Sequence, residues 1–136
     1  MINPDFSKYS LVLVSDGNVV FSSQKSGLRP LMECVDEFRG KLNKCEVHDK
    51  VIGLAAARLI VYSGMIDCVR TLTCSKLGEE LLRKHDVDVK AESMVDNILT
   101  IDKMSICPME LKAIGINNEN FYLAMKKRFE DGLVKP

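Results

Sequence analysis

Two short segments of the sequence carry the side chains best suited to chemistry. His48, Asp49 and Lys50 precede an apolar stretch, while Cys107 and Glu110 lie three residues apart near the other end of the chain. Each segment is expected to open a helix, whose positive dipole end stabilises anions and thiolates. The side chains would supply a nucleophilic thiol, two carboxylates for acid–base catalysis and a cation for binding an anionic ligand group. The pattern predicts a small-molecule site at helix N-termini.

Cys107 is the strongest nucleophile candidate among the five cysteines. The dipole of the helix that follows would favour its thiolate, which is the reactive form. Glu110, one turn later, is a candidate general base or ligand-binding carboxylate, but it would also repel a thiolate. Neither His48 nor His85 lies beside Cys107 in the sequence. The alternative is therefore a quiet cysteine before a helical proline, with Glu110 as an ordinary first-turn acid.

Asp49 is expected to cap a buried helix running from about residue 49 to residue 63. Aspartate is a favoured N-cap, which explains the residue without any further role. In the functional interpretation, Asp49 accepts a hydrogen bond from a ligand hydroxyl or amine, and Lys50 faces a ligand phosphate or carboxylate. His48, just before the helix, and Cys74, at a later strand–helix junction, would complete the ligand-binding set. Catalysis would use Cys107 as nucleophile, or Asp49 and Glu110 as acid and base.

The hydrophobic pattern predicts the elements that position these residues. Asp16 and Gly17 between two apolar runs indicate a β-hairpin at the start of the chain. Apolar residues at helical spacing indicate amphipathic helices, and Gly64 is placed to end the buried one. The expected elements are strands 11–14 and 19–21, helices from 28 to about 42 and from 49 to 63, strand 68–73, helix 76–84, strand 87–91, a strand near 97–101, a helix from 107, and a terminal helix capped at 117–118.

This order predicts one α/β domain over residues 1–136. A chain of this length can bury a substantial core without a second domain. Strands alternating with helices give a mixed sheet of about five strands that opens with the hairpin. Crossover connections would place helices on both faces, giving a three-layer α/β/α fold. Phe121, Tyr122, Met125 and Phe129 form a helical stripe that belongs to the core or, alternatively, to a homodimer contact.

Three phrases of the sequence resemble an uncharacterised bacterial family, a domain of unknown function with a cytidine-deaminase-like fold. The resemblance spans roughly residues 11–111, and the phrases that carry it are Ser15-Asp16-Gly17, residues 49–57 and Cys107-Pro108-Met109-Glu110. It implies a cytidine-deaminase-like mixed sheet. It implies a fold more firmly than an activity, because one fold carries many functions.

The chain departs from the zinc site of working deaminases. Those enzymes open a helix with a His or Cys ligand, follow it with a Glu two residues later, and supply two cysteines at the next junction. Here His48 is followed by Asp49 and Lys50, and Cys74 has no partner three residues on. We therefore expect no cofactor. Zinc held by His48 or Asp49 with Cys74 and Cys107 is the alternative, because these ligand types suit the metal.

Composition excludes several other classes. Nineteen basic and nineteen acidic residues give no net charge, so we expect no nucleic-acid partner. No apolar run is long enough to span a bilayer and no signal peptide is evident, which predicts a cytoplasmic protein that does not bind membranes. The favoured function is binding of a nucleoside-like or nucleotide-like metabolite without standard zinc chemistry. The alternatives are a non-catalytic interaction module and an atypical metal-dependent nucleobase deaminase.

Overall fold

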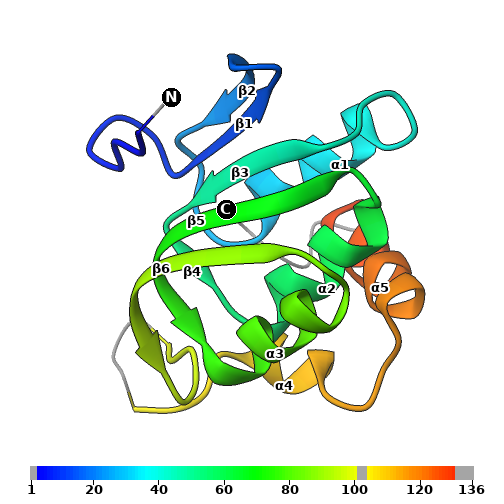
Figure 1. The fold of residues 1–136 in the computed structure, drawn as a ribbon. Helices are drawn as coiled ribbons and strands as arrows, with labels where there is room; N and C mark the ends of the chain where they lie inside the picture. The colour runs from blue at the N-terminus through cyan, green and yellow to red at the C-terminus, as the bar shows by residue number, and fades with distance from the viewer. Residues whose placement is uncertain (1–2, 101–103, 131–136) are drawn as a thin grey trace.

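The computed structural model describes residues 3–100 and 104–130, and these form six strands and five helices (Figure 1). The strands are β1 (Leu11–Ser15), β2 (Asn18–Ser23), β3 (Cys45–Asp49), β4 (Val51–Ile52), β5 (Ile66–Ser75) and β6 (Asp88–Val95). The helices are α1 (Arg29–Phe38), α2 (Leu54–Ser63), α3 (Lys76–Lys84), α4 (Pro108–Ala113) and α5 (Asn118–Glu130). No helix in these residues combines the length and the apolar character needed to cross a lipid bilayer.

The strands form one mixed sheet. The hairpin strand β1 pairs antiparallel with β2 and with β3, whereas β5 pairs in parallel with β3, β4 and β6. The predicted hairpin is confirmed, because Asp16 and Gly17 both adopt the positive φ values that a tight turn between twisted strands requires. The two short strands β3 and β4 are separated by Lys50, and both pair with the same edge of β5. A mixed α/β fold is therefore correct.

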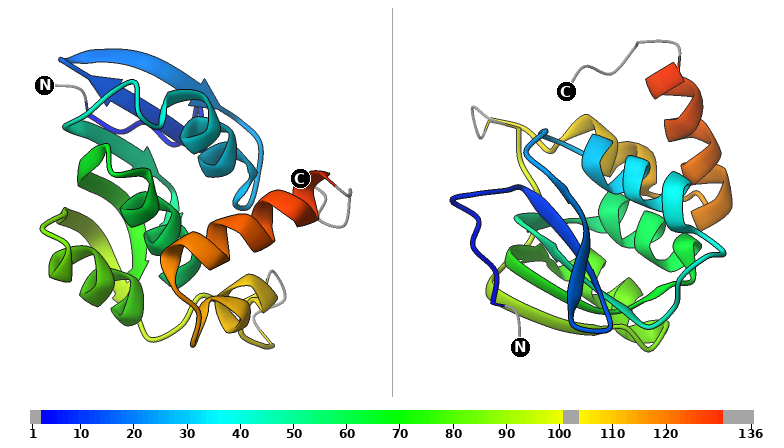
Figure 2. Two further views of the ribbon diagram at one scale, coloured as in Figure 1. Left: turned by 90° about the vertical axis from the view of Figure 1, so that its right-hand side faces the viewer. Right: turned by 90° about the horizontal axis from the view of Figure 1, so that it is seen from above.

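The helices lie on one face of the sheet, not on both as the sequence led us to expect (Figure 2). Helix α2 contacts α1 and α3 directly, which it could not do through an intervening sheet. The parallel crossovers explain this arrangement. The chain moves from β3 to β5 to β6 in one direction across the sheet, so right-handed connections place α2 and α3 on the same side. Helices α4 and α5 also pack against α2.

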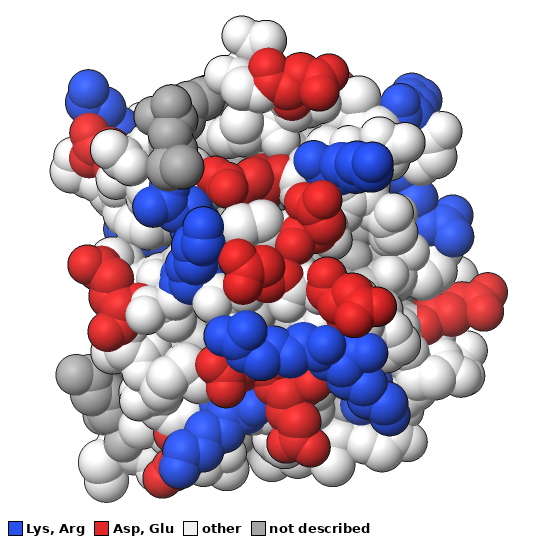
Figure 3. All heavy atoms as spheres, viewed as in Figure 1, with Lys and Arg blue, Asp and Glu red and all other residues white. Residues whose placement is uncertain are grey.

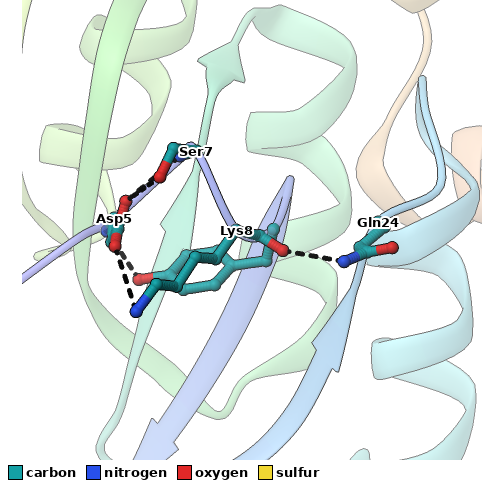
Figure 4. A network of polar contacts seen from close by, with 5 residues as sticks. Asp5, Ser7, Lys8 and Gln24 are labelled. Atoms are coloured by element: carbon teal, nitrogen blue, oxygen red, sulfur yellow. Dashed lines mark hydrogen bonds and ion pairs between the residues drawn. The ribbon is translucent and has the colours of Figure 1, made fainter.

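The opposite face of the sheet has no helix over it in the described residues. Acidic and basic side chains are interspersed on the side of the molecule that Figure 1 presents (Figure 3). The N-terminal segment folds over part of this face, where Phe6 borders a hollow beside Leu72 of β5. The segment is held locally: Ser7 N–H donates to Asp5 over 3.2 Å, and the Gln24 side chain donates to the Lys8 carbonyl over 3.0 Å (Figure 4).

The buried helix begins later than the sequence indicated. Residues 45–49 and 51–52 are strands, and α2 starts at Leu54, so the prediction of Asp49 as its N-cap is wrong. Only Lys50 separates β3 from β4, and only Gly53 separates β4 from α2, so the sequence gives little punctuation between strand and helix here. The predicted end is confirmed, since Gly64 adopts the left-handed conformation with φ 65°.

The remaining elements agree with the prediction except for one. Helix α3 has the predicted bounds, and Asn117 caps α5 by accepting the Asn120 N–H over 2.7 Å. The strand predicted near residues 97–101 is reduced to one bridge between Leu99 and Ile106 in the described residues, and residue 101 lies outside them. The stripe on α5 belongs to the core through the fully buried Phe121 and Met125.

Candidate functional site

The N-terminus of α2 receives a carboxylate from a distant part of the chain. The Glu110 oxygens accept the Leu54 N–H over 2.8 Å and the Ala55 N–H over 2.7 Å. Glu110 is only 8% exposed. Burial raises the pKa of its carboxyl, and the two backbone donors limit that rise. The predicted candidate Glu110 therefore lies in the first turn of its own helix α4, and its carboxylate caps the start of a second helix, α2.

Gly53 makes this contact possible. It is the N-cap residue of α2 and offers no side chain to cap the helix. A Cβ atom at this position would lie 1.9 Å from Oε1 of Glu110. The glycine is thus required by the close approach of the carboxylate, and Glu110 performs the capping that a serine or aspartate would usually perform.

Helix α3 starts beside α2. Ser75 is its N-cap, and the Ser75 hydroxyl accepts the Gly78 N–H over 3.0 Å. A Cβ atom on Gly78 would lie 2.8 Å from the Gly53 carbonyl oxygen, so the two helix starts touch through backbone. Cys74 is fully buried at this junction, and burial raises the pKa of its thiol to about 11. Such a thiol is a core group and not a nucleophile at neutral pH.

A groove opens next to these helix starts. A crevice of about 10 Å³ is bordered by Ser75 and Glu110, and an adjoining open hollow of about 290 Å³ continues along α3. The two spaces share three apolar lining residues, Leu54, Leu77 and Ile114. We call the combined space the α3–α4 groove, with these three residues as its apolar wall. Its crevice end carries the polar side chains of the lining, with Asp96 and Asn97 beside the apolar Ile106, and we call it the polar end.

Arg58 of α2 holds the segment between α4 and α5, which borders the groove. Its Nε donates to the Ala113 carbonyl over 2.7 Å, and its Nη1 donates to the Asn118 side chain over 3.0 Å. These bonds tie the end of α4 and the start of α5 to the same helix that Glu110 caps. The position of Glu110 is therefore supported from two sides.

Cys107 lies one turn before Glu110. It is the N-cap residue of α4, half-buried, and its side chain makes no capping hydrogen bond. Its carbonyl accepts the Glu110 N–H over 2.9 Å. The structure thus brings the candidates Cys107, Cys74 and Glu110 to one end of the sheet, where parallel strands end and helices begin.

His48, Asp49 and Lys50 are not at the start of α2. His48 is fully buried in β3 with Nε2 2.6 Å from the Glu46 carboxylate, while its Nδ1 has no partner. Asp49 ends β3, and burial raises the pKa of its carboxyl to about 7. Lys50 is exposed, and its carbonyl accepts the Thr73 N–H over 3.3 Å. Placing these three side chains at the helix start was an error, because they end a strand.

Comparisons with known proteins identify the family. A family model described as "TM1506: Domain of unknown function (DUF1893)" matches residues 5–129. The chain belongs to the DUF1893 family. A crystal structure of a DUF1893 protein (TM1506) from Thermotoga maritima is similar, with a TM-score of 0.81 and 25% sequence identity over 90% of this chain and 82% of that one. No functionally curated protein matches the sequence.

The helix start of this DUF1893 protein does not suit a deaminase zinc ion. The start of α2 presents Gly53, Leu54 and Ala55, none of which has a metal-binding side chain. Over residues 3–100 and 104–130, no three His, Cys, Asp or Glu side chains are grouped so that they could hold a metal. His48 could not join Cys74 and Cys107 as ligands, because it is buried in β3 against Glu46.

Some residues of this DUF1893 site escaped the sequence argument. Ser75 had a usable signal, since serine directly before a helical run is a typical N-cap. Gly53 was interpreted as a close-packing residue, and the structure gives that packing a specific partner in Glu110. Leu77 and Ile114 had no signal, because an apolar groove wall has the same sequence pattern as an ordinary helix face.

Proposed function

We propose that this DUF1893 domain binds a small polar metabolite of nucleoside type in the α3–α4 groove, without zinc chemistry. The supporting observation is a buried carboxylate, Glu110, that borders the polar end of a groove with an apolar wall. Ligand sites commonly combine an apolar cavity with a few fixed polar groups. The position is also the usual one in α/β sheets, beyond the carboxyl ends of the parallel strands.

The polar end of the groove favours hydrogen-bond donors on the ligand. Glu110 already occupies the anion position at the α2 N-terminus, so a ligand phosphate would have to displace it. Asp96 and Asn97 add further acceptor oxygens. An amino or hydroxyl group would therefore face the crevice, while a flat apolar body lies against Leu54, Leu77 and Ile114. A nucleoside has this combination of groups, and the phosphate-binding role once expected for Lys50 has no support at this position.

The cytidine-deaminase-like arrangement is part of the proposal. The order of the sheet, with an antiparallel hairpin followed by parallel strands and crossover helices, supports it. The proposed activity is binding and not deamination, because the helix start lacks metal-binding side chains. Cys107 remains a candidate nucleophile through its position one turn from Glu110, and cysteine chemistry would be an addition to binding.

Nuclear magnetic resonance titration tests the proposal. Adenosine and cytidine are added separately to ¹⁵N-labelled protein, and we expect chemical-shift changes centred on the amides of Leu54, Leu77 and Ile114. Leu77→Glu should abolish these changes by placing a charge on the apolar wall. Leu123→Glu is the matched control, since Leu123 is similarly exposed on α5 outside the groove lining. If neither nucleoside shifts these amides, or if Leu77→Glu leaves the response unchanged, the proposed site is wrong.

A second function is favoured by the exposure of the groove rim. Leu77 is 45% exposed and Ile114 is 57% exposed, and exposed apolar side chains of this kind often mark protein contacts. In this alternative the groove receives an apolar segment of a partner protein. The same Leu77→Glu variant then loses a protein complex in a pull-down, while neither nucleoside perturbs the spectrum.

A further inference from the structure

A second hollow lies on the face of the sheet that no helix of the described residues covers. Its volume is about 280 Å³, close to the lower limit of ordinary ligand pockets, so it suits a ligand of few atoms. Pro4, Phe6 and Leu72 form its apolar side, and Leu72 is 37% exposed there. The hollow shares no lining residue with the α3–α4 groove, so we call it the open-face hollow.

Strand periodicity brings two cations and a carboxylate together on the floor of the open-face hollow. Val89 of β6 is buried in the hydrophobic core, so Lys90, the next residue, projects to the opposite face, and Glu92 follows two positions later. Arg70 of β5 is the register partner of Lys90 in the parallel pairing, and Leu72 follows Arg70. Both charge signs therefore border one small space with an apolar side.

The charged groups of the floor are not neutralised by each other. Lys90 is paired with Asp88 instead, at an Nζ–carboxylate distance of 4.0 Å, and its side chain remains 55% exposed. Among residues 3–100 and 104–130, the Glu92 carboxylate has no hydrogen-bond or ion-pair partner. Positions 90 and 92 are about 7 Å apart along the strand. A ligand with an ammonium and a carboxylate on one carbon can contact both residues across this distance.

The N-terminal segment holds the apolar wall of the hollow beside this floor. The Asp5 N–H donates to the Tyr9 hydroxyl over 2.8 Å, and the Gln24 side chain donates to the Lys8 carbonyl (Figure 4). The Phe6 ring meets the Tyr9 ring edge to face, with 5.9 Å between the ring centroids. Wall and floor are thus both positioned by contacts within the chain, which lowers the ordering cost of binding a ligand.

We propose that the open-face hollow binds a free α-amino acid with an apolar side chain. The ligand carboxylate contacts Arg70 and Lys90, and its ammonium contacts Glu92. Its side chain lies against Phe6 and Leu72. A residue within a peptide lacks both charges on its α-carbon, so the hollow selects the free amino acid. This ligand is separate from the nucleoside-type ligand proposed for the α3–α4 groove.

Other classes of small ligand satisfy fewer of these groups. A phosphate or a simple carboxylic acid would pair with Arg70 and Lys90, but Glu92 would repel it. An amine without a carboxylate would pair with Glu92 and be repelled by the two cations. An uncharged apolar molecule would cover Phe6 and Leu72 and leave the three charges without a partner in the ligand. A zwitterion matches both signs at once.

Nuclear magnetic resonance titration of the full-length ¹⁵N-labelled protein with L-phenylalanine tests the proposal. We expect chemical-shift changes centred on the amides of Phe6, Leu72 and Lys90, while the amides of Leu54 and Leu77 in the α3–α4 groove stay unchanged. Two analogues separate the charges at about pH 6, where an α-amino group is protonated. N-acetyl-L-phenylalanine lacks the ammonium and L-phenylalaninamide lacks the carboxylate. Each should bind about fivefold more weakly than L-phenylalanine, since each loses one charged contact in a half-open site.

Two variants assign the charges of the ligand to residues of the hollow. Glu92→Gln should weaken binding of L-phenylalanine about fivefold without weakening that of N-acetyl-L-phenylalanine, which has no ammonium. Lys90→Met should likewise weaken binding of L-phenylalanine without weakening that of L-phenylalaninamide. Glu119→Gln is the matched control, because Glu119 is an exposed acid on α5 outside the hollow.

Three results would each overturn the proposal. The first is the absence of any response at the Phe6, Leu72 and Lys90 amides up to the solubility limit of L-phenylalanine. The second is equal affinity for L-phenylalanine and its two analogues, which would mean that the hollow does not recognise the charges. The third is a loss of affinity in Glu119→Gln as large as that in Glu92→Gln. None of these results bears on the groove, whose amides report on nucleosides separately.

Discussion

Helices α2 and α3 begin side by side at the same end of the sheet, but their N-termini are capped in different ways. Ser75 caps α3 from the adjacent position in the chain, with its hydroxyl 3.0 Å from the Gly78 N–H. Glu110 caps α2 from 56 residues further along, through both carboxylate oxygens. The local cap stabilises one helix, whereas the remote cap also fixes α4 to the layer of helices that covers the sheet. One contact thus positions both the groove and its polar end.

The remote cap also has a stricter sequence requirement than the local one. Residue 53 must lack a side chain, and residue 110 must be a carboxylate of the correct length. A serine cap needs only a hydroxyl at its own position. Substitutions around the α2 start should therefore cost more stability than substitutions around the α3 start.

Gly53→Ala should have the largest effect on stability. Its Cβ would lie 1.9 Å from Glu110 Oε1, so the carboxylate must leave and two buried N–H groups lose their acceptor. We expect a loss of about 3 kcal/mol in the free energy of unfolding, measured by urea denaturation. In the Glu110→Ala background the same substitution should cost far less, because the clash is gone. Additive effects of the two substitutions would show that the glycine serves another purpose.

Glu110→Ala should cost about 2 kcal/mol on its own, because it leaves the Leu54 and Ala55 N–H groups without their acceptor in a buried site. Glu119→Ala is the matched control, since Glu119 is an exposed acid in the first turn of α5. Its loss should change the free energy of unfolding by less than about 0.5 kcal/mol. Equal losses in the free energy of unfolding for the two variants would mean that Glu110 acts only as an ordinary acidic residue at a helix start.

The difference between the two caps also explains what sequence could and could not predict. Local rules found the hairpin from Asp16 and Gly17, the bounds of α3 and the end of α2 at Gly64, because each depends on neighbouring residues. The partner of Glu110 could not be found, since nothing in residues 107–111 indicates which helix start lies nearby. The structure places the predicted candidates Cys107 and Glu110 one turn apart, but the contact that joins Glu110 to the start of α2 is tertiary.

The boundary between β3 and α2 failed for another reason. Strand β3 reads Cys-Glu-Val-His-Asp, a short mixed pattern that indicates no element by itself, and only hydrogen bonding to β1 and β5 assigns it to the sheet. The sequence argument therefore assigned His48 and Asp49 to the start of α2, whereas both residues lie in strand β3. The assignment of helices to both faces failed because it requires the order of strands across the sheet, which no single segment encodes.

Asp49 gives a pH-dependent comparison with Glu110. It is partly buried at the end of β3, and burial raises the pKa of its carboxyl from 3.8 to about 7. The folded state then binds this proton more tightly than the unfolded state, so the group's contribution to stability falls as pH rises from about 4 to about 7. Asp49→Asn removes this dependence.

We expect the free energy of unfolding of Asp49→Asn to exceed that of the wild type by on the order of 1–2 kcal/mol at pH 8, and the two proteins to converge near pH 4. Urea titrations at several pH values measure the difference. Parallel curves for the two proteins from pH 4 to pH 8 would mean that the Asp49 carboxyl titrates as it does in water.

Ser75→Ala should have the smallest effect, a loss of about 1 kcal/mol, because one local hydrogen bond to the Gly78 N–H is removed. Ser22→Ala, at an exposed position in β2, controls for the substitution itself and should be close to neutral. The informative quantity is the ratio to Glu110→Ala. Losing a cap that only completes a helix should lower the free energy of unfolding about half as much as losing one that also joins two segments of the fold. In nuclear magnetic resonance spectra, the amide signals of α4 should shift only when Glu110 is replaced. If Ser75→Ala equals or exceeds Glu110→Ala, the α2 cap has no organising role beyond its own hydrogen bonds, and the α3–α4 groove is held by Arg58 and the apolar wall alone.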